Sequence, residues 1–133
     1  MAQHDLRTDL FIGGEWRPAA DGARFDVLDP GTEEVIASVA SAGADDGRAA
    51  AAAAAAAQPG WAATAPRQRA EVLRRAWELL TERADALATL ITRENGKVLA
   101  EAKGEITYAA EFFRWISEEA VRLRGEISTA PAG

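Results

Sequence analysis

The sequence has no cysteine and only one histidine among its 133 residues. Without cysteine the chain can form no disulfide, no thiolate metal site and no thiol nucleophile. The histidine, His4, lies in a polar stretch, where we expect a solvated side chain rather than a catalytic base. The sequence also contains neither a GxGxxG pattern nor a phosphate-binding loop. It therefore predicts no catalytic, cofactor-binding or metal-ligating residue in this chain.

Positive charge is also scarce. The chain has 15 lysines and arginines against 21 acidic residues, which gives a net charge of −6. This balance excludes nucleic-acid phosphates and anionic membrane surfaces as the main partners. The alanine run at 49–57 is too short to span a bilayer, and the polar start has no secretory apolar core. Together with the absence of cysteine, these features predict a soluble, cytoplasmic protein.

The first third of the chain, 9–40, has the pattern of strands and turns. Gly13-Gly14 suits a two-residue hairpin whose central residues need positive φ. Residues 24–28 and 34–39 alternate apolar and polar side chains, as half-buried strands do. Between them, the turn sequence at 29–32 (DPGT) reverses the chain. These signals predict a small antiparallel meander of three strands, which needs another element to cover it.

The remainder, 45–125, has the pattern of three helices. Asp45 is the expected cap of an alanine-rich helix that ends at 58–60. Pro66 suits the first turn of a second helix, which Asn95-Gly96 ends. The third helix follows at once and runs to Gly125.

Each long helix has an apolar stripe at steps of three and four. In the second helix the stripe is Leu73, Trp77, Leu80, Ala84, Leu87 and Ile91, and in the third it is Leu99, Ala102, Ile106, Ala109, Phe113, Ile116, Ala120 and Leu123.

A second apolar stripe on the third helix consists of Tyr108, Phe112 and Trp115. One partner helix cannot cover both stripes, so either the strands or an absent part of the protein covers this one. A stacking platform for bases is disfavoured because glutamates surround the aromatic side chains. The expected organisation is a disordered tail at 1–8, an α+β segment at 9–125 with strands before helices, and a truncated linker at 126–133.

The order of several short motifs resembles the N-terminus of NAD(P)-dependent aldehyde dehydrogenases. These motifs are FIGGEW, FDVLDPGTEEVIASV, the alanine-rich helix and ENGKVLAEAKGEI. The resemblance extends from about Leu10 to Gly125. The stretch LAEAKGEITYAAEFFRWISEEAVRLRGE is similar to the succinate-semialdehyde dehydrogenase branch, and related semialdehyde and betaine-aldehyde branches share parts of it. The implied fold is the N-terminal part of the α/β aldehyde dehydrogenase fold.

The resemblance also implies a reaction. In the family a cysteine thiolate attacks the aldehyde, hydride passes to NAD or NADP, and a glutamate activates water to release the acid. All of these groups lie beyond the segment that this chain resembles, so we expect the chain alone to be inactive. Its implied partners are the remainder of the enzyme and its subunits, in a homo-oligomeric parent. Val27, Leu28 and Glu94 match positions that hold a structural cation in some members, although a surface role is favoured for Glu94.

Two other functions stay open at the level of sequence. The chain could be a non-catalytic helical interaction module, or an assembly partner that docks on an intact aldehyde dehydrogenase. The sequence that follows this segment in the gene would separate these readings from an N-terminal portion of the enzyme.

Overall fold

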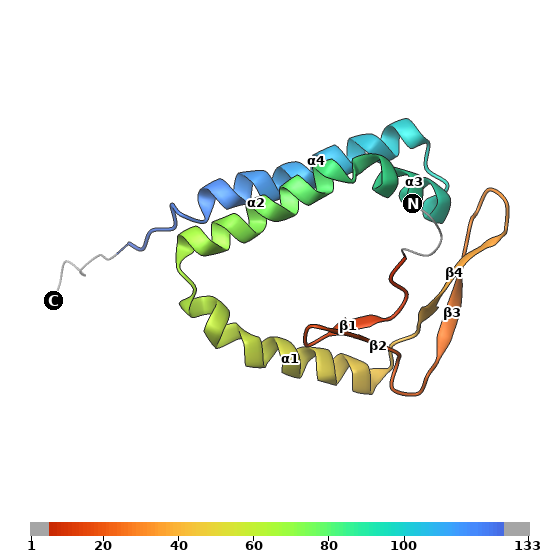
Figure 1. Cartoon of the computed structure of the whole chain (residues 1–133), viewed down its shortest axis with the longest axis horizontal. Helices are drawn as coiled ribbons and strands as arrows, with labels where there is room; N and C mark the ends of the chain where they lie inside the picture. The colour runs from red at the N-terminus through yellow and green to blue at the C-terminus, as the bar shows by residue number, and fades with distance from the viewer. Residues whose placement is uncertain (1–5, 127–133) are drawn as a thin grey trace, which may run out of the picture.

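The computed structural model describes residues 6–126, in which four strands are followed by four helices (Figure 1). This confirms the predicted α+β order of antiparallel strands first and helices afterwards. The elements are β1 (Leu10–Ile12), β2 (Glu15–Arg17), β3 (Arg24–Leu28), β4 (Val35–Ala40), α1 (Ala44–Ala63), α2 (Pro66–Glu82), α3 (Ala84–Asn95) and α4 (Leu99–Glu119).

The strands form two separate hairpins, so the prediction of one three-stranded meander is wrong. β1 pairs with β2, and β3 pairs with β4, each antiparallel. Gly13 and Gly14 have φ values of 65° and 89°, which confirms the tight turn predicted for them. The two hairpins stay apart because the loop after β2 is held elsewhere: Ala20 donates its backbone N–H to a carboxylate at the start of α1.

Arg24 joins the two hairpins. Its guanidinium contacts Asp9 Oδ1 at 2.8 Å and donates to Ser38 O at 2.7 Å and Thr8 Oγ1 at 3.0 Å. Thr8 O also accepts a hydrogen bond from the backbone N–H of Ala40. Of the predicted tail at 1–8, the first five residues lie outside the described residues, as do residues 127–133 of the predicted linker.

Helix α1 begins and ends outside its predicted bounds. Its N-cap is Gly43 rather than Asp45, which instead pairs with Arg48 at 2.5 Å. The helix also continues through Pro59 to Ala63. The alanine run has enough helix propensity to carry the helix past proline, and the chain becomes extended only just before Pro66.

The second predicted helix is divided into α2 and α3 at Arg83. Arg83 has φ −104° and ψ 10°, outside the helical range, while its N–H still donates to Leu79 O. The break lets both halves pack along α4, which contacts α2 and α3 over much of its length. At the other end of α3, Gly96 has a φ of 76°, which confirms the predicted left-handed stop.

The core is small and consists mainly of alanine. Ala88 and Ala102 are completely buried, and Ile106 packs beside them with the partly buried Ala84, Leu87 and Ile91. The predicted stripe on α4 is correct at Ala102 and Ile106. It is wrong at Leu99, which is exposed, and towards the C-terminal end, where Phe113 and Ile116 are exposed. There the buried positions are Ala110 and Ser117, because α2 packs on a face rotated from the predicted one. The helix also ends at Glu119, short of the predicted Gly125, so the exposed Leu123 lies beyond it.

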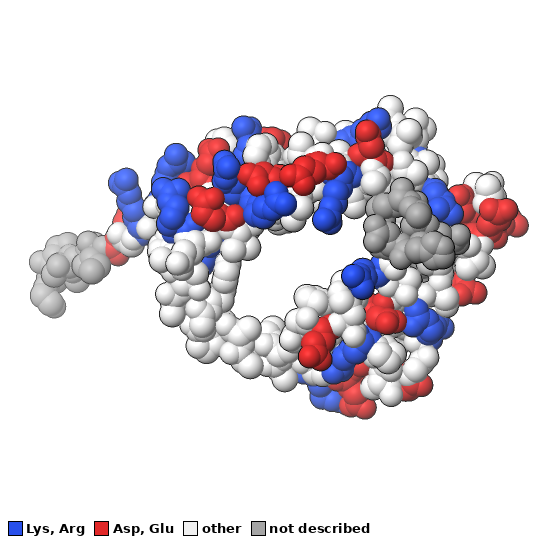
Figure 2. Space-filling model, in the orientation of Figure 1, with Lys and Arg blue, Asp and Glu red and all other residues white. Residues whose placement is uncertain are grey.

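The elements enclose an open ring (Figure 1). Helix α1 and the hairpin β1–β2 form one side, and α2, α3 and α4 form the other. One junction is the short link between α1 and α2, and the opposite junction brings Pro30 of the β3–β4 turn against Gly96. The space-filling view shows that side chains leave the centre of the ring open (Figure 2). Among residues 6–126 no helix has both the length and the apolar character needed to cross a membrane.

Candidate functional site

The described residues bring no catalytic group together. Within 6–126 there is no cluster of three or more histidine, cysteine, aspartate or glutamate side chains that could hold a metal ion. His4 lies outside the described residues. Acidic and basic side chains are instead spread along the outer faces of the helices, where they alternate in sign (Figure 2). Several form i,i+3 or i,i+4 pairs, which are typical of a solvated helix surface.

The positions that match a family cation site come together only in part. Val27 and Glu94 line a shared cavity of about 450 Å³ with Ile91, Asn95, Lys97 and Glu105. Leu28 is not among the lining residues and is half exposed.

The donor set of this cavity does not fit a bound cation. Lys97 places an ammonium group there, and its Nζ lies 2.5 Å from Glu105 Oε2. The hydrogen bond to Glu105 raises the pKa of Lys97, so the positive charge is retained. A second cation would be repelled by this ammonium and would find Glu105 already paired. Glu94 itself is exposed.

A second cleft, of about 320 Å³, lies between α2 and α4. It contains three guanidinium groups, those of Arg67, Arg74 and Arg114. Arg74 is paired with Glu78 at 3.0 Å, and Arg114 with Glu111 at 2.6 Å. Because two of these charges are paired within the helices and Glu71 and Glu118 also line the cleft, the cleft has no strong preference for an anion.

The one buried carboxylate among residues 6–126 is structural. Asp46, at the start of α1, accepts hydrogen bonds from the backbone N–H groups of Gly43 and Ala20 and from Arg17. The backbone hydrogen bond from Gly43, then that from Ala20, lowers the pKa of Asp46, and burial opposes them. From sequence alone, an acidic residue at this position is explained by the positive end of the helix dipole. The long-range partner of Asp46, Ala20, gave no signal because backbone groups carry no sequence pattern.

The aromatic stripe on α4 is the largest uncovered feature that the sequence singled out. Tyr108 is 66% exposed, Phe112 55% and Trp115 64%. Tyr108 and Phe112 contact each other edge to face, with ring centroids 4.9 Å apart. The strands do not cover this stripe, so that alternative is excluded. Other large apolar side chains, including Phe11 and Trp16 on the first hairpin, are about half exposed as well.

The sequence model described as "Aldehyde dehydrogenase family" matches residues 16–133. The chain belongs to the aldehyde dehydrogenase family. It is 46% identical over 121 residues to the succinate-semialdehyde dehydrogenase [NADP(+)] GabD of Escherichia coli. The matched stretch covers 91% of this chain and 25% of that protein. It is 47% identical over 121 residues to a glutarate-semialdehyde dehydrogenase of Pseudomonas putida, with the same two coverages.

The fold agrees with this membership. The structure superposes on the crystal structure of succinate-semialdehyde dehydrogenase from Burkholderia pseudomallei with a TM-score of 0.90 and 44% identity. The superposition covers 95% of this chain and 26% of that one. The chain thus spans about a quarter of the length of the relatives that it matches.

Proposed function

We propose that this chain forms the N-terminal part of an NAD(P)-dependent aldehyde dehydrogenase that oxidises a semialdehyde, with succinate semialdehyde as the favoured substrate. The reaction converts R–CHO, water and NAD(P)+ into R–COO−, NAD(P)H and two protons. The observation that carries the proposal is the match in both sequence and fold to semialdehyde dehydrogenases along nearly the whole chain.

In this proposal the chain contributes structure rather than chemistry. It has no cysteine to attack the aldehyde and no glycine-rich turn to bind the cofactor. Its open ring and exposed apolar side chains are features of a segment that packs on further polypeptide. The partners are the remaining parts of the enzyme and its subunits, in a cytoplasmic homo-oligomer.

The test is a chimera in which this chain replaces the matched segment of E. coli GabD. With succinate semialdehyde and NADP+, we expect the chimera to produce reduced nicotinamide, while the chain alone produces none. Glutarate semialdehyde and betaine aldehyde, assayed in parallel, report whether this segment shifts the substrate preference. A well-folded chimera without activity, or turnover by the pure chain, would contradict the proposal.

The assembly-partner alternative makes a different prediction. A docking partner would bind intact GabD. An N-terminal segment would not bind it, because intact GabD already contains its own matching segment at that position. We therefore expect no co-elution of the chain with intact GabD on a sizing column.

A further inference from the structure

The outer side of α4 contains a helical glycine that nothing within this chain explains. A Cβ added at Gly104 would meet no atom within 4 Å beyond its neighbours and its own helix backbone. Glycine inside a helix is less stable than alanine by about 1 kcal/mol. Within this chain, then, Gly104 weakens α4 and relieves no steric conflict.

Gly104 lies on the same side of α4 as the aromatic stripe. At 3.6 residues per turn, Gly104, Tyr108 and Trp115 lie roughly 160–200° around the helix axis from Ile106. Phe112 is about 240° away by the same geometry. Ile106 packs in the core formed with α3. The glycine and the three aromatic residues therefore lie on the side of α4 opposite its buried face.

This outer face has the composition of a contact surface. It runs about 16 Å along the helix from Gly104 to Trp115. Charged residues border the aromatic rings, with Glu101 before them, the Glu111–Arg114 pair beside them and the Glu119–Arg122 pair after them. An apolar centre with a polar rim is characteristic of protein–protein contacts. A glycine in such a face lets another backbone approach closely.

Resting on the proposed function, we propose that Gly104, Tyr108, Phe112 and Trp115 form a docking face for the polypeptide that corresponds to the remaining three quarters of the fold. That polypeptide packs over α4 as a further layer, so that α4 becomes a central helix with α2 and α3 on its other side. The occupant is identified by the superposition, in which this chain accounts for only 26% of a longer relative.

The docking face predicts effects of opposite sign in the chain alone and in the chimera with GabD. In the chain alone, Gly104→Ala raises the melting temperature by about 3–5 °C, because only helix propensity changes. In the chimera it lowers the melting temperature by at least about 2 °C, because the new methyl group meets the packed layer. Phe112→Ser lowers the melting temperature of the chain only slightly, through loss of the edge contact with Tyr108, and lowers that of the chimera by more.

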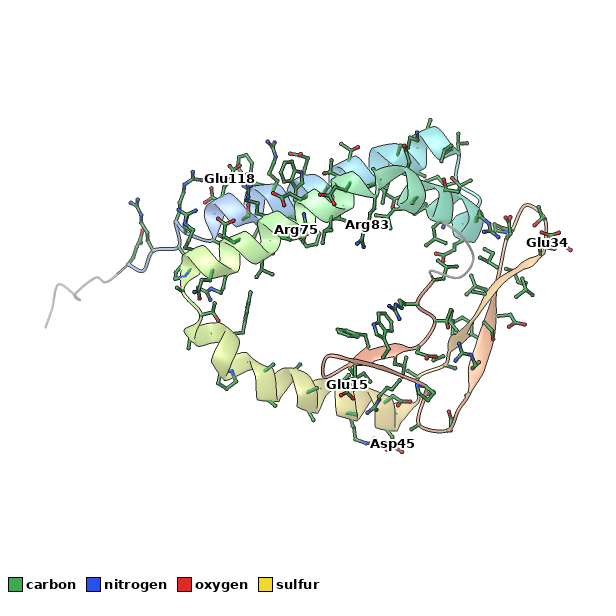
Figure 3. All side chains as sticks on the ribbon, in the orientation of Figure 1. Glu15, Glu34, Asp45, Arg75, Arg83 and Glu118 are labelled. Atoms are coloured by element: carbon green, nitrogen blue, oxygen red, sulfur yellow. The ribbon has the colours of Figure 1, made fainter. Side chains whose placement is uncertain are left out.

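Glu118→Ser is the matched control. Glu118 is an exposed residue of α4 (Figure 3) that lines the cleft towards α2, and we expect no shift in either protein. If Gly104→Ala stabilises both proteins and Phe112→Ser affects neither, the face is solvent-exposed in the complete fold and the proposal is overturned. A destabilisation of the chain alone by Phe112→Ser as large as that of the chimera would also overturn it. So would a discrete dimer of the chain that Phe112→Ser dissociates, since a second copy would then be the occupant.

The readout is stability, so it separates this inference from the proposed activity. If the chimera is inactive but its melting temperature changes as predicted, the docking face is supported and the proposed reaction is refuted. If the chimera is active but its melting temperature does not change as predicted, the proposed reaction is supported and the docking face is refuted. If the chimera does not fold, the same variants are compared with the chain co-expressed alongside truncated GabD. Failure of both pairings to give a folded product overturns the proposal.

Discussion

Asp46 and Ala20 are joined by a hydrogen bond of 3.1 Å although they lie 26 positions apart in the sequence. The Asp46 carboxylate also accepts the N–H of Gly43, the N-cap of α1. One side chain therefore caps the first helix and fixes the loop that separates the two hairpins.

The ionisation of Asp46 predicts a pH-dependent stability. Hydrogen bonds from Gly43 and Ala20 lower its pKa in the folded chain. The contribution to stability is present above the pKa of the unfolded carboxyl, near 4, and is lost as pH falls through the lower folded value. Asp46→Asn should therefore lower the melting temperature at pH 7 and reduce the loss of stability below about pH 4.

Asp45→Asn is the control for this prediction, because the Asp45 side chain is 79% exposed and pairs only with Arg48. Melting curves of the parent and both variants, recorded from neutral to acidic pH, make the comparison. Equal pH dependence of the parent and Asp46→Asn would show that Asp46 does not contribute in this way.

Gly96→Ala should destabilise the chain at the junction that closes the ring. Gly96 has a φ of 76°, and an added Cβ would lie 3.0 Å from Pro30 Cγ. The left-handed conformation alone costs a non-glycine residue about 1–2 kcal/mol, and the contact with Pro30 adds to it. Gly47→Ala is the contrasting variant, because Gly47 lies in α1 with open space around it and should gain stability. Urea unfolding measures both, and equal effects of the two substitutions would exclude this account of Gly96.

Trp77→Ala should destabilise the helical half of the chain, although less than full burial would imply. Trp77 is only partly buried and lines the cleft between α2 and α4. Removing a fully buried aromatic side chain costs about 3–5 kcal/mol, so we expect roughly 2 kcal/mol here. Trp61→Ala, at a tryptophan that is 48% exposed near the end of α1, should cost less than Trp77→Ala, because more of its side chain is already in water in the folded chain. A thermal melt of Trp77→Ala that overlays the parent would place Trp77 outside the core.

Local backbone requirements could be predicted from the sequence. Gly13-Gly14 and Asn95-Gly96 have turn and stop chemistry that depends on neighbouring residues alone, and the structure confirms both. The break at Arg83 could not be predicted, because no glycine or proline marks it and the apolar period continues across it. It is explained only by the packing of α2 and α3 on α4.

Prediction of the candidate surface from the sequence was limited for the same reason, because tertiary packing decides which side of a helix is covered. The stripe of Tyr108, Phe112 and Trp115 was visible as a second period on one helix, and the structure confirms that the strands do not cover it. The buried face of α4 was misassigned near Ser117, because the partner helix rather than hydrophobicity decides which side is covered. The role of Gly104 was not predicted, since a mid-helix glycine acquires meaning only when its surroundings are known to be empty.

The central claim is that this chain is an incomplete fold whose apolar surfaces are covered by further aldehyde dehydrogenase polypeptide. The most direct measurement is the binding of a hydrophobic dye by the pure chain, together with its elution volume on a sizing column. The account predicts strong dye binding or open-ended self-association without a discrete dimer, weakened when Phe112 and Trp115 are both replaced by serine. A sharply melting monomer that does not bind the dye would contradict it, and would identify the chain as a free-standing helical module.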